Sequence, residues 1–114
     1  MKRRKDRIAD ITVTRGSGNV FADLGLPDAE ERLAKAALAV AISRVIEERG
    51  LTQRQAAAVM GIDQPKVSHL LRGRLRDFST DRLMGFLTSL GRDLEIVVRP
   101  APKSRKRGRI HVAA

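Results

Sequence analysis

The chain has 114 residues and a formal net charge of +10, so it has room for one small domain and not for a large multi-domain enzyme. It contains no Cys, which excludes a disulfide framework, a thiol nucleophile and a cysteine-based zinc site. The longest apolar run, residues 36–42, is far shorter than the stretch of about 20 residues that a membrane helix needs, and no apolar stretch follows the basic N-terminus. We therefore expect a soluble cytoplasmic protein with no membrane partner.

Most of the positive charge lies in the two tails. Residues 1–15 hold six Lys/Arg and two acids, and residues 101–114 hold five and no acid, whereas residues 16–100 are nearly balanced. Such runs are typical of solvated, disordered arms that keep a protein soluble. They also strengthen contact with a polyanion through counterion release, without sequence preference. The sequence leaves both interpretations open.

Residues 1–27 are predicted to form a basic arm that ends in a short apolar segment. An alternating patch at residues 8–14 could form a strand, and a turn rich in Gly and Ser separates it from residues 20–26. Val20, Phe21 and Leu24 could form one apolar face. That face would either dock on a partner protein or cover the chain's own first long helix.

A long helix is predicted from Asp28 to about Arg49. Asp28 can cap it while Glu31, three residues on, reaches back to the cap, and Gly50 ends it. Its apolar positions cover more than one face, so we expect a central and heavily buried helix. These positions are Leu33, Ala37, Leu38, Val40, Ala41, Ile42, Val45 and Ile46.

Two short helices are predicted next. Thr52 caps the first, with Gln55 at the capping-box position, and Gly61 ends it. Asp63 caps the second, in which Pro65 is tolerated because the first turn loses no intrahelical bond there. This second short helix ends at residue 73.

A fourth helix is predicted after the cap Ser79, with Phe78 stapled onto Leu83 and Gly91 closing it. Beyond it, Leu94, Ile96 and Val98 alternate with other residues until Pro100, which predicts a strand. A lone strand needs a partner, either residues 8–14 or the same strand of a second copy. Antiparallel pairing of two copies would form a homodimer with its recognition helices about 34 Å apart, which suits a palindromic site.

The two short helices also have the spacing of a helix-turn-helix. Small Ala57 allows the helices to cross closely, Gly61 can take the positive φ of a tight turn, and Val67 with Leu70 anchors the second helix. Apart from one proline, the remaining outward positions carry donors suited to base edges and phosphates. They are Gln64, Pro65, Lys66, Ser68, His69 and Arg72.

Over roughly residues 30–90 the sequence resembles the helix-turn-helix domains of the Xre family, the fold of phage repressors. The resemblance implies a mainly α, lambda-repressor-like bundle of four principal helices, with the C-terminal strand paired across a dimer. It also implies that residues 64–72 enter the major groove of double-stranded DNA while Gln53 holds a phosphate. By position, the base or groove-edge contacts would be Gln64, Lys66 and His69, with Pro65 offering only apolar contact, and the phosphate contacts Ser68, Arg72 and Arg74.

Other interpretations of this helix pair remain. It could be purely structural, and His69, Arg72, Arg74 and Arg76 could be solvated side chains. However, residues 53–76 hold five Lys/Arg against one acid, which favours an anionic partner. We expect no catalysis, because no nucleophile set can be proposed, and no cofactor or metal, because the chain has only two His.

Three stretches further resemble the HigA-type antitoxins encoded beside RelE-like toxins. They are residues 16–27, residues 63–68 and residues 93–98. The resemblance implies a small, nucleoid-associated bacterial regulator that dimerises, binds a RelE/HigB-like toxin and represses its own operon. Val20, Phe21 and Leu24 are then the candidate toxin-binding residues.

Two alternatives remain, namely a stand-alone phage-like Xre regulator and a nonspecific nucleic-acid binder that works through its basic tails. The expected organisation has four parts. Residues 1–27 form the arm and partner segment, 28–91 the DNA-binding domain, 92–100 the dimerisation strand and 101–114 a basic disordered tail. The dimer contacts would be Leu94, Ile96 and Val98.

Overall fold

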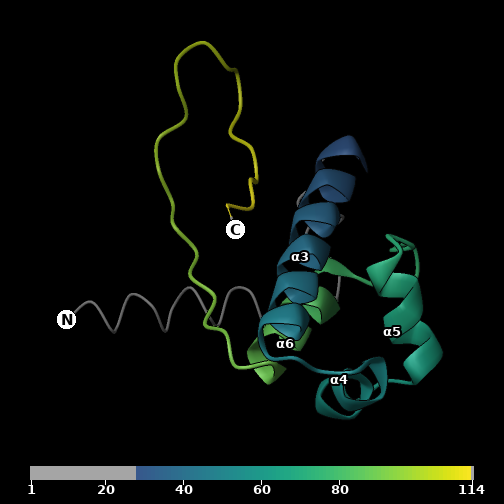
Figure 1. Cartoon of the computed structure of the whole chain (residues 1–114). Coiled ribbons are helices and arrows are strands. Elements are labelled where there is room, and N and C mark those ends of the chain that lie inside the picture. The colour runs from purple at the N-terminus through teal and green to yellow at the C-terminus, as the bar shows by residue number, and fades with distance from the viewer. Residues whose placement is uncertain (1–27, 114) are drawn as a thin grey trace.

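The computed structural model describes residues 28–113, which contain four α-helices. These are α3 (Asp28–Glu48), α4 (Gln53–Met60), α5 (Gln64–Leu71) and α6 (Thr80–Ser89). In Figure 1 the long helix α3 stands at the centre, α6 lies behind its lower half, and α4 and α5 continue the bundle below and to one side. The helical part of the fold prediction is confirmed.

The helix ends agree with the sequence in most respects. At α4 the Thr52 side chain accepts from the Gln55 backbone at 3.0 Å, and the Gln55 side chain accepts from the Thr52 backbone at 2.9 Å, so the capping box is present. The Ser79 hydroxyl accepts from the first turn of α6 at 3.1 Å. Two details differ. Asp63 precedes α5, but its side chain makes no capping hydrogen bond. Asp28 is the first residue of α3 and not the cap before it.

One buried cluster joins the four helices. Its largest fully buried side chains include Ile42 of α3, Leu70 of α5 and Leu83 of α6. Phe78, just before α6, packs edge-to-face against Phe86 with ring centroids 5.8 Å apart. The core is thus built from the faces that the helices turn towards one another, which fixes α5 relative to α3 and α6.

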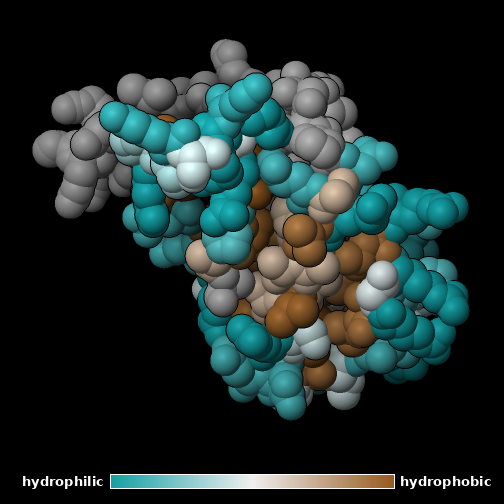
Figure 2. Space-filling view, turned by 90° about the horizontal axis from the view of Figure 1, so that it is seen from above, coloured by the Kyte–Doolittle hydropathy of each residue, from teal (hydrophilic) through white to brown (hydrophobic). Residues whose placement is uncertain are grey.

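The prediction that α3 is buried on more than one face is wrong in part. Its buried residues are Ala34, Leu38, Ala39, Ile42, Val45 and Ile46. Leu33 and Val40 lie elsewhere on the helix and are 72% and 48% exposed. Since the other described helices cover a single stripe of α3, its remaining apolar residues face outward. Figure 2, seen from above, shows apolar residues gathered between hydrophilic margins.

The predicted C-terminal strand is absent from the described part of the chain. Residues 92–113 form neither helix nor strand. Leu94, Ile96 and Val98 are 39%, 48% and 91% exposed. A strand exists only where a second extended segment supplies hydrogen bonds, and the described residues contain no such segment beside this one. The other predicted partner, residues 8–14, lies outside the described residues.

Residues 92–113 leave the end of α6, extend away from the helices and turn back towards α3 (Figure 1). The backbone N–H of Ile110 donates to Oε1 of Glu30 at 3.0 Å, and Val112 packs against the core as a partly buried residue. None of the described helices is both long enough and apolar enough to cross a membrane.

Candidate nucleic-acid interface

Helices α4 and α5 form a compact pair whose inner residues are those the spacing predicted. Ala57 is 6% exposed, Val67 is fully buried and Leu70 is 1% exposed. Gly61 between the helices has φ +73°, a left-handed conformation that costs an L side chain about 1–2 kcal/mol. The Gly61 and Ile62 backbone N–H groups both donate to the Ala57 carbonyl, at 2.8 and 3.1 Å. These hydrogen bonds end α4 and form the tight turn that leads to α5.

The opposite face of α5 is available to solvent. Pro65, Ser68, His69 and Arg72 follow one another at the spacing that places residues on one side of a helix. All are exposed except Ser68, which is half-buried, and the flanking Gln64 and Lys66 are exposed as well. Arg74 and, at the start of α4, Gln53 are also exposed. The structure therefore brings most of the predicted contact residues to one exposed helix.

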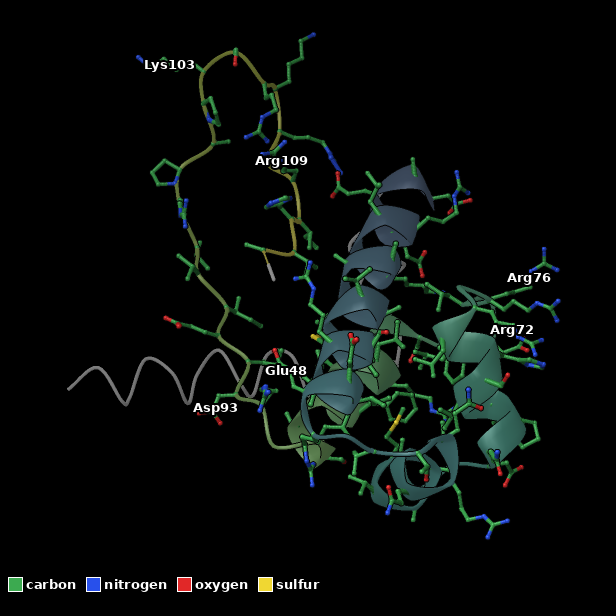
Figure 3. All side chains as sticks on the ribbon, viewed as in Figure 1. Glu48, Arg72, Arg76, Asp93, Lys103 and Arg109 are labelled. Atoms are coloured by element: carbon green, nitrogen blue, oxygen red, sulfur yellow. The ribbon has the colours of Figure 1, made fainter. Side chains whose placement is uncertain are left out.

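The interface carries free positive charge. Its basic residues are Arg54, Lys66, Arg72, Arg74 and Arg76. The ion pairs found among the described residues are Glu31–Lys35, Glu48–Arg92 and Glu30–Arg107, so none of them involves these five cations. In Figure 3, Arg72 and Arg76 both project away from α3. Cations presented in this way can bind phosphates without first breaking an internal ion pair.

A pocket of about 310 Å³ lies beside α5, and sequence analysis did not predict it. Lys66 and His69 of α5 line one side, and Phe78, just before α6, and Arg82, in the first turn of α6, line the other; Asp63 and Asp77 also border the pocket. The Arg82 guanidinium stacks on the rings of Phe78 and Phe86, 5.6 and 5.3 Å from their centroids. This stacking holds a cation next to the exposed face of α5. The only sequence signal for it was an Arg in the first turn after the Ser79 cap.

Not all predicted functional residues belong to this interface. Leu94, Ile96 and Val98 lie beyond α6 on the C-terminal segment and are exposed. The candidate toxin-binding residues Val20, Phe21 and Leu24 lie outside the described residues. No group of three or more His, Cys, Asp or Glu side chains that could hold a metal ion occurs within residues 28–113.

A pair of helices joined by a tight glycine turn, with the second helix anchored inside and polar outside, defines the helix-turn-helix class. The family model described as "Helix-turn-helix domain" matches residues 20–99, and the chain belongs to this family. The chain is also similar to a solved structure described as "Putative XRE Family Transcriptional Regulator". The two are 51% identical with a TM-score of 0.72, and the match covers 77% of this chain and 99% of the other.

No curated protein matches the sequence significantly. The two matches confirm the prediction of an Xre-family helix-turn-helix protein and support a DNA-binding transcriptional regulator. They leave the HigA-type subgroup as a prediction.

Proposed function

We propose that this protein is a sequence-specific transcriptional regulator that inserts α5 into the major groove of double-stranded DNA. The observation that carries the proposal is the two-sided character of α5. Val67 and Leu70 are buried, whereas Gln64, Lys66 and His69 are exposed. A helix held rigidly on one side and polar on the other can present side chains to base edges at fixed positions.

A reporter fused to the DNA upstream of the gene tests this role. We expect the wild-type protein to repress the reporter, and Gln64→Ala with His69→Ala to relieve repression without lowering protein abundance. Glu47→Ala on α3, which removes an exposed side chain from another helix, serves as the control and should repress normally. Equal repression by all three proteins would contradict the proposal.

The protein is further proposed to act as a homodimer on a palindromic operator. Leu94, Ile96 and Val98 are exposed apolar residues on an extended segment, and a second copy of this segment could pair with it as an antiparallel strand. Sedimentation at micromolar concentration should give a dimer for the wild type and a monomer for Ile96→Asp. Ala101→Asp, which adds the same charge just beyond the segment, is the control. A monomeric wild type would contradict the proposal.

The resemblance to HigA-type antitoxins supports a finer role, in which the protein neutralises a RelE/HigB-like toxin and represses the operon that encodes both. Val20, Phe21 and Leu24 are the proposed toxin-binding residues. Leu33 and Val40, which are exposed and seven residues apart on α3, add apolar surface near that segment in the sequence.

Purification from native cells tests the antitoxin role. We expect a small toxin to accompany the wild type at equal molar yield and to be lost from Phe21→Asp. If Phe21→Asp retains every partner and only melts at a lower temperature, this segment covers the protein's own helix instead. If the wild type has no partner, the protein is a stand-alone regulator.

A further inference from the structure

The C-terminal arm, residues 99–113, is the most basic segment of the described chain. It contains six Lys/Arg and no acid. They are Arg99, Lys103, Arg105, Lys106, Arg107 and Arg109. Most of these side chains are exposed. The helix-turn-helix interface accounts for none of them, because in Figure 1 the arm lies on the other side of α3 from α5.

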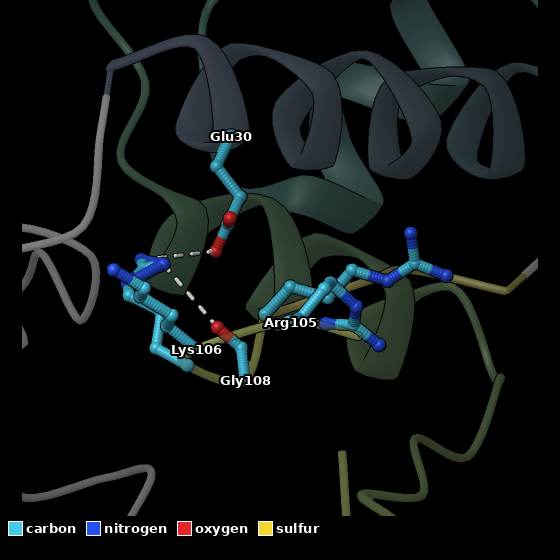
Figure 4. Close-up of a pocket in the computed structure, with 6 residues that line it drawn as sticks. Glu30, Arg105, Lys106 and Gly108 are labelled. Atoms are coloured by element: carbon cyan, nitrogen blue, oxygen red, sulfur yellow. Dashed lines mark hydrogen bonds and ion pairs between the residues drawn. The ribbon is translucent and has the colours of Figure 1, made fainter. Parts of the chain in front are cut away.

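One carboxylate makes the polar contacts between this arm and α3, and Val112 adds an apolar contact to the core. Glu30 Oε1 accepts from the Ile110 backbone N–H at 3.0 Å and lies 3.9 Å from Arg107 Nη2. Around it, residues 105–109 and Glu30 line a pocket of about 310 Å³ (Figure 4). A single acid therefore faces a whole run of cations, and most of their charge is not neutralised within the described part of the protein.

The arm also contains a buried donor for which the described residues provide no acceptor. Arg105 Nη1 is inaccessible to solvent and has no hydrogen-bond partner among the described residues. A buried guanidinium N–H without a partner destabilises the docked arrangement. A phosphate oxygen is the kind of acceptor that guanidinium groups bind best.

The arm is weakly attached and long. Arg107 is half exposed, and exposed ion pairs contribute little to stability. If the arm detaches, the residues from Gly91 to Arg109 can span roughly 60 Å at about 3.3 Å per residue. This length is enough to reach backbone phosphates beyond those contacted by α5.

We propose that the C-terminal arm is a second DNA-binding element, which contacts backbone phosphates without sequence preference and leaves Glu30 when it does so. The proposal rests on the proposed function, since α5 is what brings the arm to a duplex. Duplex DNA is the partner that fits best, because it presents a dense row of phosphates over a length comparable to that of the extended arm.

The salt dependence of binding tests the arm directly. Lys106→Gln with Arg109→Gln should lower the slope of log K against log salt by about 2, since each phosphate contact contributes about 0.9. The loss should be equal on the upstream DNA and on a scrambled duplex. Arg32→Gln with Arg44→Gln, which removes two exposed charges from α3, is the matched control and should leave the slope nearly unchanged. If both double variants have the wild-type slope, the arm does not bind DNA.

A pair of single substitutions tests release from Glu30. Glu30→Ala and Glu31→Ala each remove a carboxylate from the same helical turn, but Glu31 pairs with Lys35 and not with the arm. Because Glu30→Ala removes both the acceptor of the Ile110 N–H and the partner of Arg107, we expect it to bind the scrambled duplex several-fold more tightly than Glu31→Ala. Equal affinities would overturn the role of Glu30.

Amide hydrogen exchange adds a readout that does not depend on affinity. The Ile110 N–H should exchange faster when duplex is added, because it loses its bond to Glu30, while amides of α5 exchange more slowly. If the exchange rate of the Ile110 amide is unchanged at saturating duplex, the proposal that the arm leaves Glu30 on binding DNA is overturned.

The salt-slope result also separates this proposal from the proposed function. If the salt slope depends on the arm but the protein does not prefer the upstream DNA, the arm binds DNA and sequence-specific binding is refuted. If the protein prefers the upstream DNA but the slope does not depend on the arm, sequence-specific binding stands and DNA binding by the arm is refuted.

Discussion

The helical domain, residues 28–91, and the segment that follows it, residues 92–113, are held together in different ways. The domain buries apolar side chains from all four helices in one cluster, with Ile42, Val67 and Leu83 fully buried. The following segment touches the domain mainly through the Glu30 carboxylate, which accepts from the Ile110 N–H, through two surface ion pairs, Arg107–Glu30 and Arg92–Glu48, and through the partly buried Val112. Packing fixes the first region, whereas polar contacts that water and salt can replace hold the second.

This difference matches the proposed roles. Recognition of base edges needs side chains held at fixed positions, and α5 obtains this from the buried core beneath it. Contact with phosphates needs charge and reach more than position, and an extended basic arm provides both. Helix α5, the proposed base-contacting element, and the arm that we propose to detach thus lie on opposite sides of α3 (Figure 1).

The largest difference in stability between the two regions is expected from a substitution in the core of the helical domain. Ile42→Ala should lower the free energy of unfolding by about 2–5 kcal/mol, because it leaves a cavity at a fully buried position. Truncation after Pro100 removes far more atoms but should lower it by at most about 1 kcal/mol, since the lost contacts are few and the ordering of the chain is no longer required. Urea denaturation measures both. A truncation that costs as much as Ile42→Ala would show that the arm belongs to the core.

The next largest loss of stability is expected from a substitution in the turn between α4 and α5. Gly61→Ala forces an L side chain to take φ +73°, so we expect a loss of about 1–2 kcal/mol in thermal unfolding. Gly108→Ala in the arm, where the glycine has no positive φ, is the matched control and should change little. Equal melting temperatures for the two variants would contradict the account of the turn.

Loss of the capping box of α4 is expected to have a smaller effect. Thr52→Ala removes the hydroxyl that accepts from the Gln55 N–H and should cost about 1 kcal/mol. Thr52→Ser keeps the hydroxyl and should restore most of the stability. If the Ala and Ser variants have the same melting temperature, the cap does not stabilise this helix.

The smallest effect is expected where the two regions meet. Arg92 Nη2 donates to Glu48 Oε1 at 2.6 Å, but both side chains are substantially exposed, at 44% and 63%. Arg92→Ala should therefore cost less than about 1 kcal/mol, and the difference should shrink further at high salt. A salt-independent loss above this value would place the pair among the main stabilising contacts.

The sequence predicted best what depends on local signals. The capping box at Thr52, the glycine turn at residue 61 and the buried positions Val67 and Leu70 follow from residue type and spacing within a few residues, and the structure contains all of them. The polar face of α5 was predictable for the same reason, because the buried positions leave only the opposite side for the rest.

Features that depend on distant parts of the chain were not predictable. Leu33 and Val40 belong to the apolar pattern of α3, but whether they are buried depends on how many helices cover it. Residues 94–99 have the alternating apolar pattern of a strand, but no extended segment pairs with them in the described part of the chain, so no strand forms there. The Glu30 contact to Ile110 joins residues 80 positions apart, and no sequence pattern indicates it.

Binding to duplex DNA across a salt series tests the central claim most directly, using the DNA upstream of the gene and a scrambled duplex of equal length. We predict that the wild type prefers the upstream DNA and that Gln64→Ala with His69→Ala abolishes the preference, since each base contact contributes about 1–3 kcal/mol of discrimination. The salt slope of the double variant should stay close to that of the wild type. Equal binding of the wild type to both duplexes, unaffected by the substitutions, would mean that α5 does not recognise DNA sequence and that the helix pair is only a scaffold.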